Sequence, residues 1–273
     1  MEEYIRSDKS MIDNRSLEKL VADTINDYFK LYNVHPFRVS IIITKSISAA
    51  YYRVRPDLGR RDDANDYNGV MVQPKHRGEE FTILINQSTL IGNILHGHPA
   101  TLGTIIHELT HINDFKIYAD MIDEVDYDVI ADPVKHPMFM LWTEIHARAN
   151  GYYYTRWYQL KEKFGSKEYV EMVLENELPF QNSYLVENYN KSESWYQRAY
   201  LVAQYIGRLY TIRKAYRAAI SEDLLLSVTP LPNNQWIKEW FEYFCSHDSL
   251  ETAFPSFDEL RRIIPAQLPN LWI

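Results

Sequence analysis

The segment TIIHELTHINDF, residues 104–115, places two histidines and one glutamate within five positions. On an α-helix His107 and His111 lie one turn apart on the same face, with Cβ atoms about 5–6 Å apart. Two imidazoles at that separation can bind one tetrahedral Zn²⁺ ion through bonds of about 2.0–2.1 Å. Glu108 points about 100° further around the helix, so it can stand beside the metal without binding it. A glutamate in that position can act as a general base toward a metal-activated water.

A catalytic zinc site usually has three protein ligands and one position for water. Glu144 is the candidate that we predict as third ligand, because it lies in the segment LWTEIHARANGYYY among aromatic and apolar residues that should bury its helix. A buried carboxylate needs a partner, and a metal ion is the partner that we infer. Ala147 and Gly151 share a helix face with Glu144, and their small side chains let this helix approach the first one closely.

Other residues after His111 could also supply the third ligand. His136 and His146 are the two alternatives, while the acidic residues of 120–135 lie in a predicted loop that would hold a ligand poorly. Asp114 is only one turn from His111 on the same helix, so it suits a supporting role better than direct metal binding.

The elements that must position these residues can be predicted from hydrophobic patterning. Leu102, Ile105, Leu109 and Ile112 form a core-facing side of the HELTH helix, and Gly103 is expected to leave the metal-facing side open. The remaining elements are a helix, a buried strand, a loop, two strands expected to form an antiparallel hairpin, a loop, an acidic connector and a second long helix. In the same order, these are a helix at 16–32, a strand at 37–44, a loop at 55–68, strands at 67–73 and 80–87, a loop at 92–99, the connector at 120–135 and the second long helix at 137–157.

Beyond about residue 165 the pattern is one helix after another, rich in tyrosine. This order predicts an α+β fold with an all-helical C-terminal extension. We therefore predict a core domain at residues 1–165 and a helical, Tyr-rich extension at residues 166–273, which would form one wall of the cleft, a lid or a partner surface.

Composition limits the class of protein. The chain has 273 residues, a net charge of −8 and a single cysteine, Cys245. The negative charge argues against nucleic acid as the main partner, and no apolar run approaches the roughly 20 residues that span a membrane. The N-terminal residues lack the pattern of a secretory signal, so we expect a cytoplasmic protein without disulfides. The oligomeric state is left open.

The HELTH motif, followed by Glu144 33 residues later, resembles the zincin metallopeptidases whose third ligand is a glutamate. The run EIHARAN is similar to a segment of the ImmA/IrrE-type and related small prokaryotic and phage zincins. The resemblance covers roughly residues 15–160. It implies a zincin-like core of a small sheet, an active-site helix and a Glu-ligand helix. It also implies Zn²⁺ bound by His107, His111 and Glu144, and a proton passed by Glu108 to the leaving amine.

The resemblance carries two further expectations. The strand FTILINQ, residues 81–87, would be the edge strand that pairs with an extended substrate peptide. A tyrosine or histidine would assist the developing oxyanion, and the candidates are Tyr118, His146, Tyr152, Tyr153 and Tyr154.

The sequence departs from the family pattern at two positions. Arg148 stands where larger relatives carry an acid that supports a ligand histidine, so that support must come from Asp114 or Asn113. Asn113 itself replaces an apolar residue that is common in the family. No helix-turn-helix segment is evident, so a role in repressor cleavage does not follow.

The leading hypothesis is a zinc-dependent peptidase that acts on a peptide or protein substrate with Glu108 as general base. One alternative is a catalytically silent zincin-like protein that binds zinc and a partner. Another is a zinc hydrolase of a non-peptide amide, because the metal chemistry would be the same.

Overall fold

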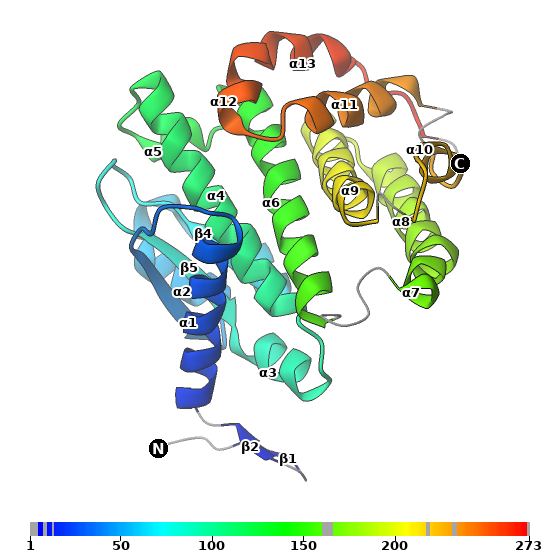
Figure 1. Ribbon diagram of the computed structural model, residues 1–273. Helices are drawn as coiled ribbons and strands as arrows, with labels where there is room; N and C mark the ends of the chain where they lie inside the picture. The colour runs from blue at the N-terminus through cyan, green and yellow to red at the C-terminus, as the bar shows by residue number, and fades with distance from the viewer. Residues whose placement is uncertain are drawn as a thin grey trace.

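Two long helices form the centre of the protein. In the computed structural model, α4 (Ala100–Ile122) and α6 (Pro137–Gln159) run side by side (Figure 1). The structure describes residues 5–7, 10–12, 14–159, 166–216, 219–230 and 234–271. The two predicted long helices are thus confirmed, and α4 extends about two turns beyond the predicted motif segment.

The N-terminal elements follow the predicted order. The helix and strand expected first are α1 (Asn14–Leu31) and β3 (Val39–Thr44), preceded by a small hairpin of β1 (Ile5–Ser7) and β2 (Ser10–Ile12). A helix not predicted from the sequence, α2 (Ile47–Val54), follows β3, and the Ser46 side chain caps it by accepting a hydrogen bond from the Ala49 amide. The predicted loop 55–68 contains two short 3₁₀ helices, η1 (Pro56–Leu58) and η2 (Asp62–Asp66).

The expected antiparallel hairpin is confirmed as β4 (Gly69–Val72) and β5 (Phe81–Asn86). The loop predicted at 92–99 is wrong in its first part, because α3 (Gln87–Leu95) continues through residue 95. The Asn86 side chain accepts a hydrogen bond from the Thr89 amide and so caps α3. An N-cap asparagine satisfies one of the amides that a helix start leaves unpaired.

The three-stranded sheet has the order β3-β5-β4. β5 pairs in parallel with β3, from Val39 opposite Phe81 to Thr44 opposite Asn86, and antiparallel with β4. The prediction that the FTILINQ strand is an edge strand is therefore wrong. Its residues 81–85 are all buried, as expected of a strand covered on both faces and paired on both sides. β4 is the edge strand on the side of α4.

Glycines allow α4 and α6 to touch through their backbones. A Cβ atom at Gly103 would lie 2.0 Å from Thr155 Oγ1 and 2.7 Å from Gly151 O. A Cβ atom at Gly151 would lie 2.5 Å from Gly103 O and 3.1 Å from His107 Cβ. The close approach predicted from Gly151 is confirmed. Gly103, expected to leave the metal-facing side open, instead forms the contact with α6.

The core continues on both sides of α4. Its predicted core residues Leu102, Ile105, Leu109 and Ile112 are buried, and so are residues on its other faces. The acidic connector contains a short helix, α5 (Tyr127–Ile130), begun by Asp126, whose side chain accepts from the Asp128 amide at 2.8 Å. Asp128 also forms a 2.7 Å ion pair with buried Arg55.

The described residues after 165 are helical, as predicted. The elements are α7 (Lys167–Met172), the π-helical turn η3 (Val173–Glu177), α8 (Leu178–Lys191), α9 (Trp195–Ala215), α10 (Glu222–Ser227), α11 (Gln235–Ser246), α12 (Leu250–Ala253), η5 (Phe254–Ser256) and α13 (Phe257–Ile263). The fold is thus α+β. One buried hydrophobic cluster includes residues from Leu17 to Leu271, so core and extension pack together, and the boundary near residue 165 stays a prediction.

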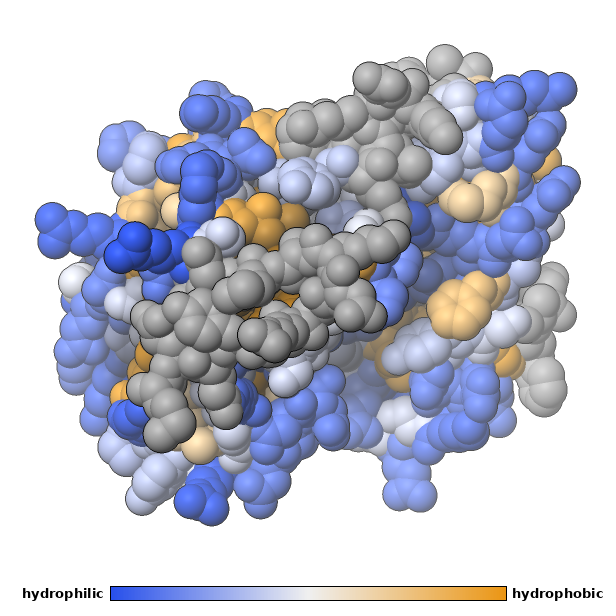
Figure 2. Space-filling model, turned by 90° about the horizontal axis from the view of Figure 1, so that it is seen from below, coloured by the Kyte–Doolittle hydropathy of each residue, from blue (hydrophilic) through white to orange (hydrophobic). Residues whose placement is uncertain are grey.

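The face of the protein seen in Figure 2 has few hydrophobic residues. The face shown in Figure 2 is mostly hydrophilic, with small hydrophobic areas between the charged residues. In the described part of the chain, no helix has the length and apolar character needed to cross a membrane.

The glycine contact leads to a stability prediction. Gly103→Ala should lower the free energy of unfolding by about 1–3 kcal/mol, because the added methyl group overpacks the α4–α6 contact. Gly92→Ala in α3 is the matched control, since a Cβ atom there meets nothing within 4 Å. It should raise the free energy of unfolding by about 0.5–1 kcal/mol. Urea unfolding of both variants measures the difference, and equal stabilities would contradict the tight contact.

Candidate metal centre

Three potential ligands converge between α4 and α6. His107 Nε2 and His111 Nε2 lie 3.0 Å apart, and Glu144 Oε2 lies 3.7 Å and 3.4 Å from them respectively. A tetrahedral zinc ion with bonds of about 2.0–2.1 Å separates its ligand atoms by about 3.3 Å. The triangle of donor atoms therefore has the size that one metal ion requires. Among the described residues, this is the one group of three or more His, Cys, Asp or Glu side chains so arranged.

The helices explain this convergence. His107 and His111 project from successive turns of α4, with ring centroids 4.6 Å apart and planes nearly perpendicular. Glu144 comes from α6. The Gly103–Gly151 contact holds α6 against α4, one turn of α4 before His107. His107 and Glu144 are buried, with only 9% and 4% of their side chains exposed. Three polar groups are thus brought together out of water, where each needs a partner.

The pKa shifts of Glu144 and His107 favour the forms that bind a metal, whereas the pKa shift of His111 does not. Burial acts to raise the pKa of Glu144, but the two histidines and Arg148 outweigh it and hold the pKa well below its ordinary value. Burial lowers the pKa of His107 well below its ordinary value. Metal ligands must be deprotonated, so an ionised carboxylate and a neutral imidazole are the forms required. Burial acts to lower the pKa of His111, but Glu144 raises it overall.

A hydrogen-bonded chain orients His111. Thr143 on α6 lies with its Oγ1 3.0 Å from His111 Nδ1, and the same hydroxyl donates to Asp114 Oδ2 at 2.7 Å. Such a contact directs the opposite nitrogen, Nε2, toward the metal position. The supporting role predicted for Asp114 thus acts through Thr143, which the sequence analysis did not single out.

The two alternative third ligands lie elsewhere. His146 Nδ1 contacts Asp114 at 3.0 Å, and its Nε2 lies 3.2 Å from Asn150 Nδ2. His136 Nδ1 lies 3.0 Å from the Tyr118 hydroxyl. Neither histidine belongs to the group of converging ligands.

Glu108 stands beside the ligands without joining them. Its Oε2 accepts a 3.0 Å hydrogen bond from the Met71 amide on β4. Burial raises the pKa of Glu108 to about 7. A carboxylate with a pKa near neutrality can both accept and release a proton under the same conditions. The Met71 amide of the edge strand β4 therefore holds the side chain of Glu108, the candidate general base, in position.

Arg148 contacts the carboxylate oxygen of Glu144 that does not face the histidines. One guanidinium nitrogen, Nη2, lies 3.3 Å from Glu144 Oε1. This ion pair engages Oε1 and leaves Oε2 facing the histidines. The departure from the family pattern noted at residue 148 thus corresponds to support of the carboxylate ligand.

The predicted oxyanion candidates are engaged away from the metal centre. Tyr118 contacts His136, the Tyr152 hydroxyl donates to Glu177, and the Tyr154 hydroxyl donates to Asp27. His146 contacts Asp114, and Tyr153 lines a pocket between α1, α6 and α9.

Two tyrosines of the extension lie nearer the site. Burial raises the pKa of Tyr196 and of Tyr200 on α9, and the nearby Glu144 carboxylate adds to both shifts; Glu108 adds to that of Tyr200. Sequence reasoning missed them because no spacing connects them to the HELTH motif.

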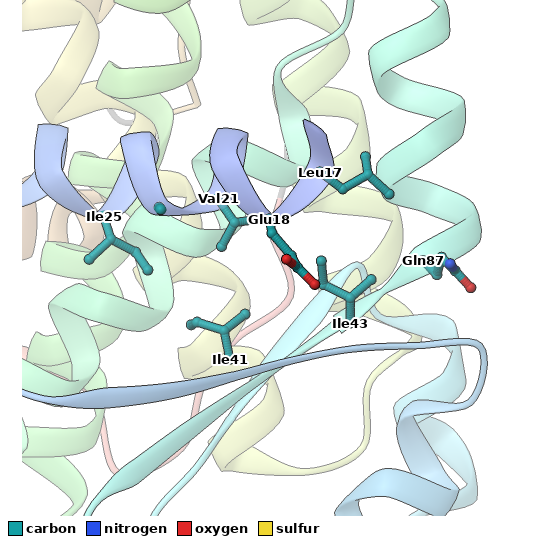
Figure 3. A pocket seen from close by; sticks show the side chains of 8 residues that line it. Leu17, Glu18, Val21, Ile25, Ile41, Ile43 and Gln87 are labelled. Carbon is teal, nitrogen blue, oxygen red and sulfur yellow. The ribbon is translucent and has the colours of Figure 1, made fainter. Parts of the chain in front are cut away.

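A separate pocket lies at the opposite edge of the sheet. It is formed by α1 and β3, with Leu17, Val21, Ile25, Ile41 and Ile43 pointing into it beside Glu18 and Gln87 (Figure 3). None of the converging metal ligands lines it. It is therefore distinct from the metal centre.

Comparison of the chain with protein-family models, curated proteins and solved structures gave no match. Functional inference therefore rests on the geometry of the site itself.

The converging ligands predict one zinc ion per chain after dialysis against metal-free buffer. Glu144→Ala should weaken zinc binding sharply, because it removes one of three ligands. Asp123→Ala and Asp126→Ala, in the acidic connector, are controls that should retain zinc. Elemental mass spectrometry and competition with a chelator measure both quantities. Equal zinc retention in all three variants would show that Glu144 is not a ligand.

The Thr143 contact predicts a smaller effect. Thr143→Val keeps the shape of the side chain but removes the hydroxyl, and zinc affinity should fall about 10-fold or more. Thr211→Val is the matched control, because Thr211 is also buried but donates to Ala149 O on the other face of α6. The two variants should lose similar stability, so an equal effect on zinc affinity would contradict the orienting role of Thr143.

Proposed function

We propose that the protein is a zinc-dependent peptidase, in which His107, His111 and Glu144 bind Zn²⁺ and Glu108 is the general base. The observation that carries this proposal is the triangle of ligand atoms with an adjacent buried carboxylate that is not a ligand. The donor set of two imidazoles and one carboxylate is common in catalytic zinc sites. It supports a zincin-like core built from α4, α6 and the β4–β5 hairpin.

Different residues of the chain have different roles in the proposed reaction. When bound, zinc supplies Lewis acidity that activates water and polarises the scissile carbonyl. The Met71 amide holds Glu108 Oε2, which leaves Oε1 to take a proton from the attacking water. The pKa of Glu108, raised by burial to about 7, favours return of that proton to the leaving amine. Arg148 and Thr143 keep Glu144 and His111 in place during both steps.

The edge strand suggests how a peptide would bind. β5 is paired on both sides, so only the free edge of β4 can accept an extended substrate near α4. Strand addition supplies main-chain hydrogen bonds and places alternate side chains in pockets. β4 therefore takes the substrate-pairing role first expected of the FTILINQ strand. Its Met71 amide is already bound to Glu108, so the substrate would pair with the remaining groups of that edge.

Glu108→Gln tests the proposal. The substitution keeps the size of the side chain but removes its basicity, so hydrolysis should fall about 10²–10⁴-fold while zinc content stays at one per chain. Glu80→Gln, an exposed glutamate before β5, is the control and should retain full activity. Mass spectrometry of a peptide library incubated with each protein measures cleavage.

Three outcomes would contradict the proposal. Equal cleavage by wild type and Glu108→Gln would exclude Glu108 as the base. A wild-type protein that holds zinc but cleaves no peptide would favour a silent zinc-binding protein. Cleavage of small acyl amides without cleavage of peptides would favour a hydrolase of a non-peptide amide.

A further inference from the structure

Helix α9 of the extension packs tightly on the helix that carries Glu144. A Cβ atom at Gly207 would lie 2.6 Å from Ile145 O and 2.8 Å from Arg148 Cβ. One turn later, Thr211 Oγ1 donates to Ala149 O at 2.9 Å. The residue that follows Gly207 is Arg208, so this contact brings a second arginine to the neighbourhood of Arg148. The extension thus contributes charge beside the metal centre.

Arg208 is a partly buried cation without a direct partner. Within the part of the chain that the structure describes, no hydrogen bond or ion pair engages its guanidinium group. It interacts electrostatically with Glu144 and Glu177 and is repelled by Arg148. Burial lowers its pKa to about 10, so it remains charged at neutral pH. A partly buried cation without a direct partner loses part of its hydration, which points to a ligand that pairs with it.

Both carboxylates near Arg208 pair with another arginine through one oxygen. Glu144 pairs with Arg148 through Oε1 and presents Oε2 to the histidines. Glu177 pairs with Arg156 and accepts the Tyr152 hydroxyl, both through Oε1, while its buried Oε2 has no hydrogen-bond partner among the described residues. Zinc would add two more positive charges. With zinc bound, the positive charges of Arg148, Arg156, Arg208 and the metal would outnumber the carboxylates of Glu144 and Glu177 on this side, although the whole chain has a net charge of −8.

Arg148 also keeps an unused donor. Its Nε is buried and has no hydrogen-bond partner among the described residues, while its Nη2 contacts Glu144. An arginine guanidinium matches a carboxylate through two parallel hydrogen bonds. Two arginines that stand on facing helices, one unpaired and one with a spare donor, are thus suited to bind an anionic group.

We propose that Arg208 and Arg148 form a subsite for a carboxylate of the substrate, next to the metal centre. The inference rests on the proposed function and names the substrate class: a peptide with a negative charge close to the scissile bond. The carboxylate can belong to an Asp or Glu side chain or to the C-terminus of the peptide.

Four versions of one cleavable peptide separate these sources. They carry Glu or Gln beside the scissile bond, each with a free or an amidated C-terminus. Wild type should prefer one of the carboxylate-bearing peptides about 10-fold or more in kcat/KM, since hydrogen bonds to charged groups are stronger than neutral ones. The preferred peptide identifies the source. Arg208→Gln should abolish the preference mainly through KM. Arg208→Lys should restore part of it.

A binding measurement tests the subsite without turnover. Zinc-loaded Glu108→Gln protein should bind the preferred peptide about 10-fold more tightly than its neutral version, and adding Arg208→Gln should remove the difference. Arg262→Gln, an exposed arginine on α13, is the control and should leave both affinities unchanged.

Two results would overturn the proposal. The first is equal binding of all four peptides by the Glu108→Gln protein. The second is a loss of thermal stability in Arg208→Gln with an unchanged peptide preference, which would show that Arg208 only balances the charge of Glu177. Because binding is measured on the inactive variant, a failure of the proposed peptidase activity would appear separately, as absence of cleavage by wild type.

Discussion

The backbone contact between Gly103 on α4 and Gly151 on α6 is the constraint on which the metal centre depends. At this point a Cβ atom on either residue would overlap the facing helix. The contact sets the separation of the two helices one turn away from His107, where a carboxylate as short as that of Glu144 must reach two imidazoles. A wider spacing would leave three polar groups buried without partners, at a cost of about 1–3 kcal/mol each.

Around that contact, each polar group of the centre is held from a different direction. Thr143 and Asp114 orient His111, Arg148 holds Glu144, and the Met71 amide holds Glu108. These supports come from α4, α6 and the edge strand β4, so the sheet and both helices must be in place before the site exists. In the proposed site, preorganisation of this kind would let these groups hold a metal ion and move a proton without rearrangement.

The C-terminal helices take part in the same site. α9 packs against α6 through Gly207 and brings Tyr196, Tyr200 and Arg208 toward Glu144. The extension therefore packs against the helix that carries Glu144. This arrangement explains why none of the tyrosines expected from the core reaches the centre, since each of those packs elsewhere.

The sequence by itself determined the local features. Helical periodicity predicted α1, α4 and α6, strand patterning predicted the β4–β5 hairpin, and the spacing of HELTH placed two histidines on one face. It also singled out Glu144, because a glutamate among apolar residues needs a partner. Only the tertiary structure decided the strand order that makes β5 central, the glycine contact, the Thr143–Asp114 support and the approach of α9. These depend on contacts between residues far apart in the chain, which no local period or spacing encodes.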